Sequence, residues 1–300
     1  TLKNKVYSFA QAPSGEPVIE DLMPLVRQIQ DFKPDCIVAI GGGSVLDIGK
    51  LIWIFYEHPD ITENELSKAF NIPAMRGKAN FIAVPTTAGT GSEMSSAAIF
   101  QSNSKSTKKF AVSHELIPDI AILDPYLVID VPRDIKINSA MDALAHSLEG
   151  YVSLFKNNYT QDLAEQSIRN IFASLEDYTD KPDINSADKV LRASNLAGIV
   201  QNISIPGLGH AISHSLSAQN IAHGLACGKF LPIAMKVNCR QKTVQDLYRS
   251  LALKLNFKDS ETLIKFIESL LEKYQINISS ELLSSLKSSE QFIENTLKDP

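Results

Sequence analysis

Residues 36–56 read CIVAIGGGSVLDIGKLIWIFY, and this stretch decides the fold class. The continuous apolar run at 36–40 is rich in β-branched residues and is typical of a strand buried on both faces. Three glycines and a serine follow at once, and the chain then reads as a helix through residue 56. A strand that passes through glycines into a helix is the repeating unit of a parallel α/β sheet.

The same alternation continues on both sides of this stretch. We predict strands at 5–9, 81–85 and 120–123 and a helix at 19–32. Strands that alternate with helices form a parallel sheet with right-handed crossovers. The character of the sequence changes near Pro132, after which strand-like runs almost disappear. Helices are predicted there at 136–154, 160–177, 186–203, 208–222, 227–238, 240–255, 259–273 and 279–297. We therefore predict an α/β domain over 1–131 and an all-helical domain over 132–300.

Composition excludes several classes of function. The net charge of −5 over 300 residues argues against a nucleic-acid partner or an anionic membrane surface. The three cysteines are too few and too scattered for a disulfide framework, which favours a reducing, cytoplasmic location. No apolar stretch approaches the length of a membrane span, and the first residues carry no signal-peptide pattern.

Two glycine- and hydroxyl-rich loops follow predicted strands. Gly41, Gly42 and Gly43 let backbone N–H groups turn towards a ligand, and the helix N-terminus beyond them favours an anion. Asp47, one turn into that helix, could cap it or face a cofactor. The second loop, TTAGTGS (86–92), adds further hydroxyls at the neighbouring strand end. We therefore expect a dinucleotide as the ligand, with a mononucleotide or a sugar phosphate as other candidates. The structural alternative is a tight strand-to-helix turn that binds no ligand.

Histidines gather in the second half of the chain. Asp142 and His146 lie at i, i+4 and share one helix face, as do His210 and His214, and a break near residue 224 would bring His223 alongside. Imidazole and carboxylate are ligands that suit divalent Zn, Fe, Ni or Mn. Such an ion is a Lewis acid that can acidify an alcohol, whose alkoxide then transfers hydride to a nicotinamide. The pattern predicts reversible interconversion of alcohol and aldehyde.

Five segments together resemble the iron-containing alcohol dehydrogenase family, within a wider group that includes glycerol dehydrogenase and dehydroquinate synthase. They are GGGSVLDIGK (41–50), VPTTAGTGSE (84–93), LIPDIAILDP (116–125), MDALAHSLEGY (141–151) and GHAISHSLSAQNIAHG (209–224). The resemblance implies the dehydroquinate synthase-like fold, which combines an α/β nucleotide-binding domain with an all-α metal-binding domain. Family members usually begin with a further segment that includes two strands of the nucleotide domain, so we expect those first strands to be missing from this chain.

The resemblance also assigns residues. By position, the metal ligands are Asp142, His146, His210 and His223. His214 is similar to a family histidine that sits near the nicotinamide without binding metal, and it is the candidate catalytic residue, relaying a proton. The implied cofactor contacts are Gly42, Gly43, Ser44, Asp47, Thr86, Thr87, Thr90 and Lys109.

The resulting expectation is a metal-dependent, NAD(P)-linked alcohol dehydrogenase or aldehyde reductase. Its cofactors are NAD or NADP and Fe(II), with Zn(II) as the competing metal, and its partner is a small alcohol or aldehyde. The resemblance allows a homodimer. A lyase of the dehydroquinate-synthase kind is one alternative, although only Lys229 and Lys236 lie near the metal motifs to hold a phosphorylated acid. A non-catalytic nucleotide- or metal-binding remnant is the other.

Overall fold

The structure is a computed structural model that describes residues 6–13, 15, 17–102, 108–216, 221–279 and 290–297. Its internal contacts divide the chain into two compact units. The first, here the N-terminal unit, comprises Thr1–Thr86 and Ser92–Ile122, and the second, the helical unit, comprises Thr87–Gly91 and Leu123–Pro300. The domain boundary at 131 and 132 stays a prediction.

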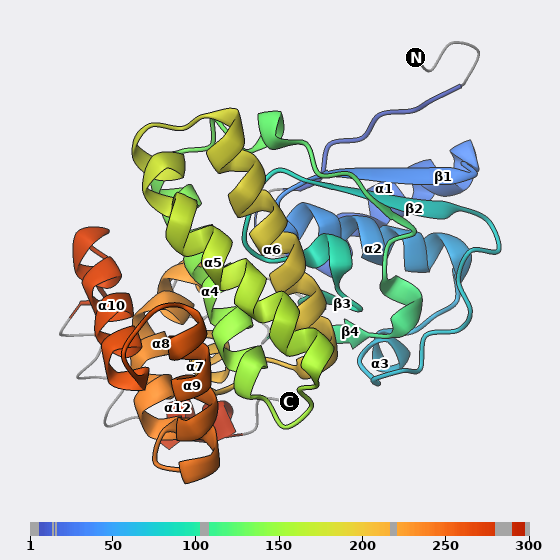
Figure 1. Cartoon of the computed structure of the whole chain (residues 1–300). Helices are drawn as coiled ribbons and strands as arrows, with labels where there is room; N and C mark the ends of the chain where they lie inside the picture. Colours follow the sequence, from blue (N-terminus) through green and yellow to red (C-terminus); the bar gives the residue numbers. More distant parts are fainter. Residues whose placement is uncertain are drawn as a thin grey trace. The chain divides into compact units, whose positions relative to one another are not determined.

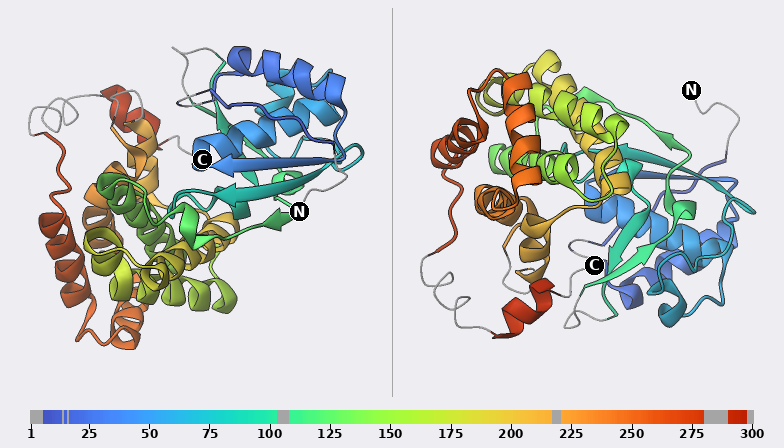
Figure 2. Two further views of the ribbon diagram at one scale, coloured as in Figure 1. Left: turned by 90° about the horizontal axis from the view of Figure 1, so that it is seen from above. Right: turned by 60° about the horizontal axis from the view of Figure 1, so that its bottom comes forward.

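A parallel sheet organises the N-terminal unit, as predicted. Strands β1 (Cys36–Gly41), β2 (Asn80–Pro85) and β5 (Ile120–Ala121) pair in the order β1-β2-β5. Helices α1 (Ile19–Phe32) and α2 (Gly43–Glu57) lie on one side of this sheet (Figures 1 and 2). Gly49 of α2 sits so close to β1 that an added Cβ would come within 2.7 Å of Ala39 Cβ. The short helix α3 (Glu63–Leu66) and the antiparallel pair β3 (Ala97–Phe100) and β4 (Lys109–Val112) complete the unit.

Two local predictions for this unit are wrong. Residues 6–9 form no strand, while Lys5 lies outside the described residues. Strand β1 is not buried on both faces either: Ala39 packs towards α2, but Val38 and Ile40 on the opposite face are 52% and 55% exposed. The apolar run does form a strand, as predicted. Within the described residues, however, β1 is the edge strand of its sheet, and one of its faces is exposed. The alternation of burial along the strand could not be read from an uninterrupted apolar run.

The remainder of the chain is almost entirely helical, as predicted. Its helices are α4 (Arg133–Val152), α5 (Asn158–Asp180), α6 (Ile184–Ser204), α7 (Leu208–Ser215), α8 (His223–Asn238), α9 (Lys242–Lys254), α10 (Ser260–Lys273) and α12 (Glu290–Leu297). Capping boxes at Asn157, Asp183 and Asp259 fix where α5, α6 and α10 begin. No helix in the described part of the chain is both long enough and apolar enough to cross a bilayer.

Helix α4 is the centre of the helical unit. It packs against α5, α6 and α8, and Figure 1 shows α4, α5 and α6 running side by side. Fifteen of its residues, from Lys136 to Val152, are buried. A helix surrounded on most sides must place its polar side chains inside the protein, where they need partners.

The helix ends around the histidines differ from the prediction. Helix α7 stops at Ser215 instead of residue 222, and residues 217–220 lie outside the described part of the chain. Helix α8 begins at His223 instead of residue 227, so this histidine is the first residue of a helix and not part of the break before it. The predicted helix 279–297 is described only as α12, because residues 280–289 are outside the described ranges.

Candidate metal centre

Helix α4 carries a polar stripe on a face that points into the helical unit. Asp142, His146 and Glu149 lie at i, i+4 and i+7, which places them on one side of the helix. All three are almost completely buried. Buried acids and imidazoles are costly unless they are paired or bind a cation, so this stripe requires an explanation beyond packing.

Two further histidines approach the stripe from α7 and α8. His210 Nε2 and His223 Nε2 each lie 3.5 Å from Asp142 Oδ1, and His146 Nδ1 lies 3.9 Å from the same oxygen. The ring of His146 stacks on that of His210 with centroids 4.2 Å apart. The structure therefore brings together the four side chains that the resemblance assigned to metal.

Outer partners orient two of these imidazoles. Glu149 Oε2 lies 2.7 Å from His210 Nδ1, and Ser213 Oγ lies 2.9 Å from His223 Nδ1. The Ser213 hydroxyl donates to the backbone oxygen of His223, so its oxygen can accept from that Nδ1. With the proton held on Nδ1 in both rings, each Nε2 presents a lone pair towards Asp142. This is the usual arrangement of metal-binding histidines.

The donor atoms at the centre lack the partners that buried polar atoms normally have. Asp142 Oδ1, His146 Nδ1 and His210 Nε2 are buried and have no hydrogen-bond partner within the described residues. Three such atoms in one place are unusual, because most buried polar side-chain atoms are hydrogen-bonded. A divalent cation among them would satisfy all three at once. The residues present therefore fit a metal ion.

Electrostatics at the centre favour positive charge. Burial by itself would raise the pKa of Asp142, but the neighbouring imidazoles lower it below the ordinary range of a carboxyl. Burial, and then the positive charge of His210, lower the pKa of His146 to about 3, so this imidazole is neutral and able to act as a ligand. Burial disfavours charge on His210 as well, yet the thiol and carboxylates around it raise its pKa.

Close approach of α8 to α4 positions His223. A Cβ added at Gly224 would come within 2.0 Å of the backbone oxygen of Asn138 in α4, so no larger residue fits there without a shift. Gly209 of α7 is similarly close to Glu149 Oε1, at 2.8 Å for an added Cβ. Glycines next to the histidines thus set the spacing between the helices that carry the donors.

His214 lies beside the centre without joining it. Its ring stacks on that of His223 with centroids 5.2 Å apart and an angle of 10° between the planes. Its ring is further from His210, at 6.3 Å. The resemblance implied that this histidine sits near the nicotinamide without binding metal, and that role stays a prediction.

The residues assigned to the cofactor fall into two groups. Gly42, Gly43 and Ser44 lie at the start of α2, directly after β1, where Gly42 is the N-cap. Thr86 follows β2, and its N–H donates to the Gly41 oxygen at 2.9 Å, so the two loops leave the sheet together. This first group lies at the carboxyl end of a parallel sheet, the usual ligand position in such folds.

The other assigned residues have internal partners. Asp47 accepts hydrogen bonds from the Ser92 hydroxyl at 2.7 Å and from the Ile99 N–H at 3.1 Å. Lys109 forms an ion pair with Glu63. Asp47 thus ties α2 to Ser92 and β3, and Lys109 ties β4 to α3.

Packing accounts for the glycines between residues 87 and 91, which lie in the helical unit. An added Cβ at Gly89 would come within 2.6 Å of Ser139 in α4, and one at Gly91 within 2.4 Å of Gly198 in α6. Gly91 also has a φ of +60°, and the Thr90 oxygen accepts from Gln201. From the sequence we attributed the glycines of this loop to ligand binding. In the structure they allow the loop to pack closely against α4 and α6. Thr87 and Thr90 are half-buried in the same loop.

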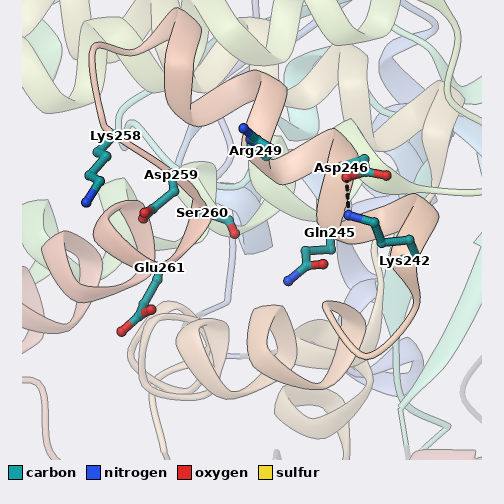
Figure 3. Close-up of a pocket in the computed structure, with 8 residues that line it drawn as sticks. All are labelled: Lys242, Gln245, Asp246, Arg249, Lys258, Asp259, Ser260 and Glu261. Atoms are coloured by element: carbon teal, nitrogen blue, oxygen red, sulfur yellow. Dashed lines mark hydrogen bonds and ion pairs between the residues drawn. The ribbon is translucent and has the colours of Figure 1, made fainter.

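A separate surface hollow lies between α9 and the start of α10 (Figure 3). Its lining is charged, but local interactions already use much of that charge. Lys242 pairs with Asp246 at 2.7 Å, and Asp259 caps α10 by accepting from the Thr262 N–H. The hollow shows no convergent set of donors like the one around Asp142.

Sequence reasoning missed three residues of the centre. Glu149 had a readable signal, because it falls at i+7 from Asp142 on the same helix face. Ser213 and Cys227 gave none, since a serine or cysteine in an apolar helix is commonplace. Four side chains have donor atoms within 4.8 Å of one another, and they are Asp142, His210, His223 and Cys227.

Comparisons with known proteins agree with this geometry. A family model described as iron-containing alcohol dehydrogenase matches residues 2–125, and a model of the C-terminal part of the Fe-containing alcohol dehydrogenase family matches residues 136–294. The chain is 30% identical to an NADPH-dependent butanol dehydrogenase of Clostridium saccharobutylicum, over 87% of this chain and 68% of that protein.

Two further relatives extend the comparison. An aldehyde-alcohol dehydrogenase of Streptococcus pneumoniae is 35% identical over 79% of this chain, which spans 28% of that longer protein. An iron-containing alcohol dehydrogenase of Thermococcus thioreducens has a similar solved structure, with a TM-score of 0.90 and 30% identity over 98% of this chain and 79% of that one.

Proposed function

We infer that this chain, which belongs to the iron-containing alcohol dehydrogenase family, is a metal-dependent, NAD(P)-linked alcohol dehydrogenase or aldehyde reductase. One observation carries the inference. Three buried donor atoms, on Asp142, His146 and His210, converge without hydrogen-bond partners among the described residues, where the family's chemistry requires a cation. Packing alone gives no reason to leave such atoms unpaired.

The proposed ligands are Asp142, His146, His210 and His223. Fe(II) is the proposed ion and Zn(II) the competitor, because imidazole and carboxylate donors suit both. When bound, the ion supplies Lewis acidity that polarises an alcohol or carbonyl oxygen. Glu149 and Ser213 keep the protons of His210 and His223 on Nδ1 and so hold each Nε2 ready for the ion. The burial of Asp142 and His146 excludes water from that side of the centre.

The other residues that the resemblance assigned have separate roles in the proposal. His214 exchanges a proton through its imidazole, which is the only general acid–base function we assign. Backbone N–H groups at Gly42, Gly43 and Ser44 bind cofactor phosphate at the start of α2. The proposed cofactor contacts also include Thr86 of the N-terminal unit and Thr87 and Thr90 of the helical unit, whereas Asp47 and Lys109 have internal partners. When bound, NAD or NADP would supply the acceptor or donor of the hydride.

The proposed setting is the cytoplasm, with a small alcohol or aldehyde as the substrate. Cys36, Cys227 and Cys239 are all free thiols, which suits a reducing compartment. A homodimer is the proposed assembly, and light scattering of the purified protein would measure it.

The test compares His223→Ala with His58→Ala, a histidine of the N-terminal unit whose Nε2 lies 3.0 Å from the Ala74 oxygen. After anaerobic purification we expect elemental analysis to find iron or zinc in the wild type and in His58→Ala but not in His223→Ala. Activity with NADH or NADPH across a panel of aldehydes should fall by more than about 100-fold in His223→Ala, beyond what changes to outer partners cost. Circular dichroism should show that both variants fold. A His223→Ala protein that keeps its metal and its activity would refute the ligand assignment.

A further inference from the structure

Cys227 lies at the candidate metal centre, although nothing in its sequence context marks it. It falls four residues after His223 in α8 and therefore lies on the same helix face. Its side chain is fully buried. Its Sγ lies 3.6 Å from His223 Nε2, the nitrogen that points towards Asp142.

The sulfur belongs to a tight group of donors. The donor atoms of Asp142, His210, His223 and Cys227 all lie within 4.8 Å of one another, which makes them a group that could hold a metal ion. Asp142 Oδ1 and His210 Nε2 are buried without hydrogen-bond partners among the described residues. His146, although close to Asp142, is not one of these four.

An ordinary apolar role does not account for this placement. Cys239, the residue that directly follows α8, shows what such a role looks like: it is half-buried and packs against the apolar core of the helical unit. Cys227 also contacts that core, but its sulfur faces imidazole nitrogens and a carboxylate instead of apolar groups alone. Cys239 is therefore a matched internal control for a thiol in the same unit.

We propose that Cys227 is a direct metal ligand, which gives the ion of this chain a sulfur donor beside Asp142, His210 and His223. The inference rests on the metal centre of the proposed function and deepens it. On binding, the thiol releases its proton to solvent and a metal–sulfur bond forms, with no change of oxidation state. A thiolate favours Zn(II), Co(II) and Fe(II) over Mn(II) and Mg(II), which prefer oxygen donors.

Cobalt substitution tests this ligand without relying on turnover. Co(II) bound to a thiolate absorbs strongly in the near ultraviolet through charge transfer from sulfur, whereas nitrogen and oxygen ligands give only weak visible bands. We expect the strong band in the full-length wild type and in Cys239→Ser, and its loss in Cys227→Ser. We also expect Cys227→Ser to bind Zn(II) at least about tenfold more weakly than the wild type, as for other changes around metal sites.

X-ray absorption of the zinc-loaded wild type provides a readout that needs no variant. The proposal predicts a sulfur scatterer at about 2.3 Å from zinc. Cobalt or zinc that binds with nitrogen and oxygen ligands only would overturn the role of Cys227 and leave the metal centre standing. A charge-transfer band that survives in a folded Cys227→Ser protein would likewise overturn it. A wild-type protein that binds neither ion would overturn both the inference and the proposed function.

Discussion

At the scale of single residues, the centre depends on side chains that would not touch the ion. Glu149 is the clearest case, because its carboxylate contacts the His210 ring and also accepts from the Gly207 N–H at 2.9 Å. Burial alone would raise the pKa of Glu149, but these hydrogen bonds lower it, so the group is ionised. A fixed negative charge behind His210 makes the ring a better donor and fixes its orientation.

Replacing that charge should weaken metal binding without unfolding the protein. Glu149→Gln keeps the size and one accepting oxygen but loses the charge, so we expect metal affinity to fall by about 10–100-fold. Competition with a chromophoric chelator measures this change. Glu176→Gln, at an exposed glutamate that pairs with Lys273, is the control and should bind metal as the wild type does. Equal affinities in the two variants would show that Glu149 has no role in binding.

Lys50 shows a different use of burial, in the N-terminal unit. Its ammonium group is fully buried and donates to the Ser95 oxygen at 2.8 Å, the Ser95 hydroxyl at 2.9 Å and the Ala97 oxygen at 2.9 Å. Burial lowers the pKa of Lys50 to about 8, despite the opposing effects of Asp47 and Glu93. The side chain thus anchors the start of β3 to α2, at the cost of a less favourable charged form.

The sign of its pH dependence follows from this shift. Between pH 8 and the ordinary lysine value of 10.5 the unfolded chain binds more protons at this site than the folded one, so stability from Lys50 rises with pH. We expect the free energy of unfolding of the wild type, relative to Lys50→Met, to increase by at most about 1.4 kcal/mol per pH unit across this window. Urea unfolding at several pH values measures the difference. A difference that stays constant or falls with pH would contradict the lowered pKa.

At the scale of elements, three helices must meet at fixed distances for the donors to converge. Helix α4 supplies Asp142 and His146, while the first turn of α7 supplies His210 and the first residue of α8 supplies His223. The contact between α8 and α4 is made possible by Gly224, where an added Cβ would lie 2.0 Å from the Asn138 oxygen. Backbone cannot move aside as a flexible side chain can, so α8 itself would have to shift.

Two glycines of α8 make a matched test of this contact. Gly224→Ala should destabilise the protein by about 1–3 kcal/mol, the usual cost of overpacking, and should reduce metal binding because His223 moves with the helix. Gly228→Ala should have a smaller effect, because its added Cβ would lie 3.0 Å from the Met141 side chain. Both substitutions replace glycine by alanine within α8, so the chemical change is the same in the two variants. Thermal unfolding and metal titration measure the two effects; a Gly224→Ala variant as stable as Gly228→Ala would disprove the steric argument.

At the scale of the whole molecule, the two units have separate apolar cores. The core of the N-terminal unit is formed by residues between Leu22 and Leu116. The core of the helical unit is formed by Ala88 together with residues from Val128 onward. The proposed ion would be held only by the helical unit, where it would link α4, α7 and α8. A ligand that binds the folded state alone stabilises it by mass action.

Metal should therefore raise the stability of the helical unit selectively. At a free Zn(II) concentration about 100 times the dissociation constant, we expect a gain of about 2.7 kcal/mol over protein with chelator. Far-ultraviolet circular dichroism follows mainly the helical unit, which contains most of the helical residues, while fluorescence of Trp53, the single tryptophan, follows the N-terminal unit. The helical signal should shift to higher temperature by more than the Trp53 signal does. No shift in the helical signal with metal would contradict a metal centre there.

The sequence by itself determined those features that depend on local pattern. The apolar run at 36–40, the glycines after it and the long helical periodicities determined a parallel sheet followed by helices. The i, i+4 spacing of Asp142 and His146 placed them on one face, because helix geometry fixes that relation without any tertiary contact. The prediction that β1 is buried on both faces was wrong, because an apolar run does not show which helices or strands cover each face of a strand.

Tertiary structure alone decided which residues surround His210 and His223. Glu149 lies 61 positions from His210 in the sequence, and it reaches that ring only because α4 and α7 pack together. Cys227 comes near Asp142 only because Gly224 lets α8 approach α4. Local pattern specifies the face on which a side chain stands, whereas the distance to a donor on another helix is set by packing, which sums contacts over the whole unit.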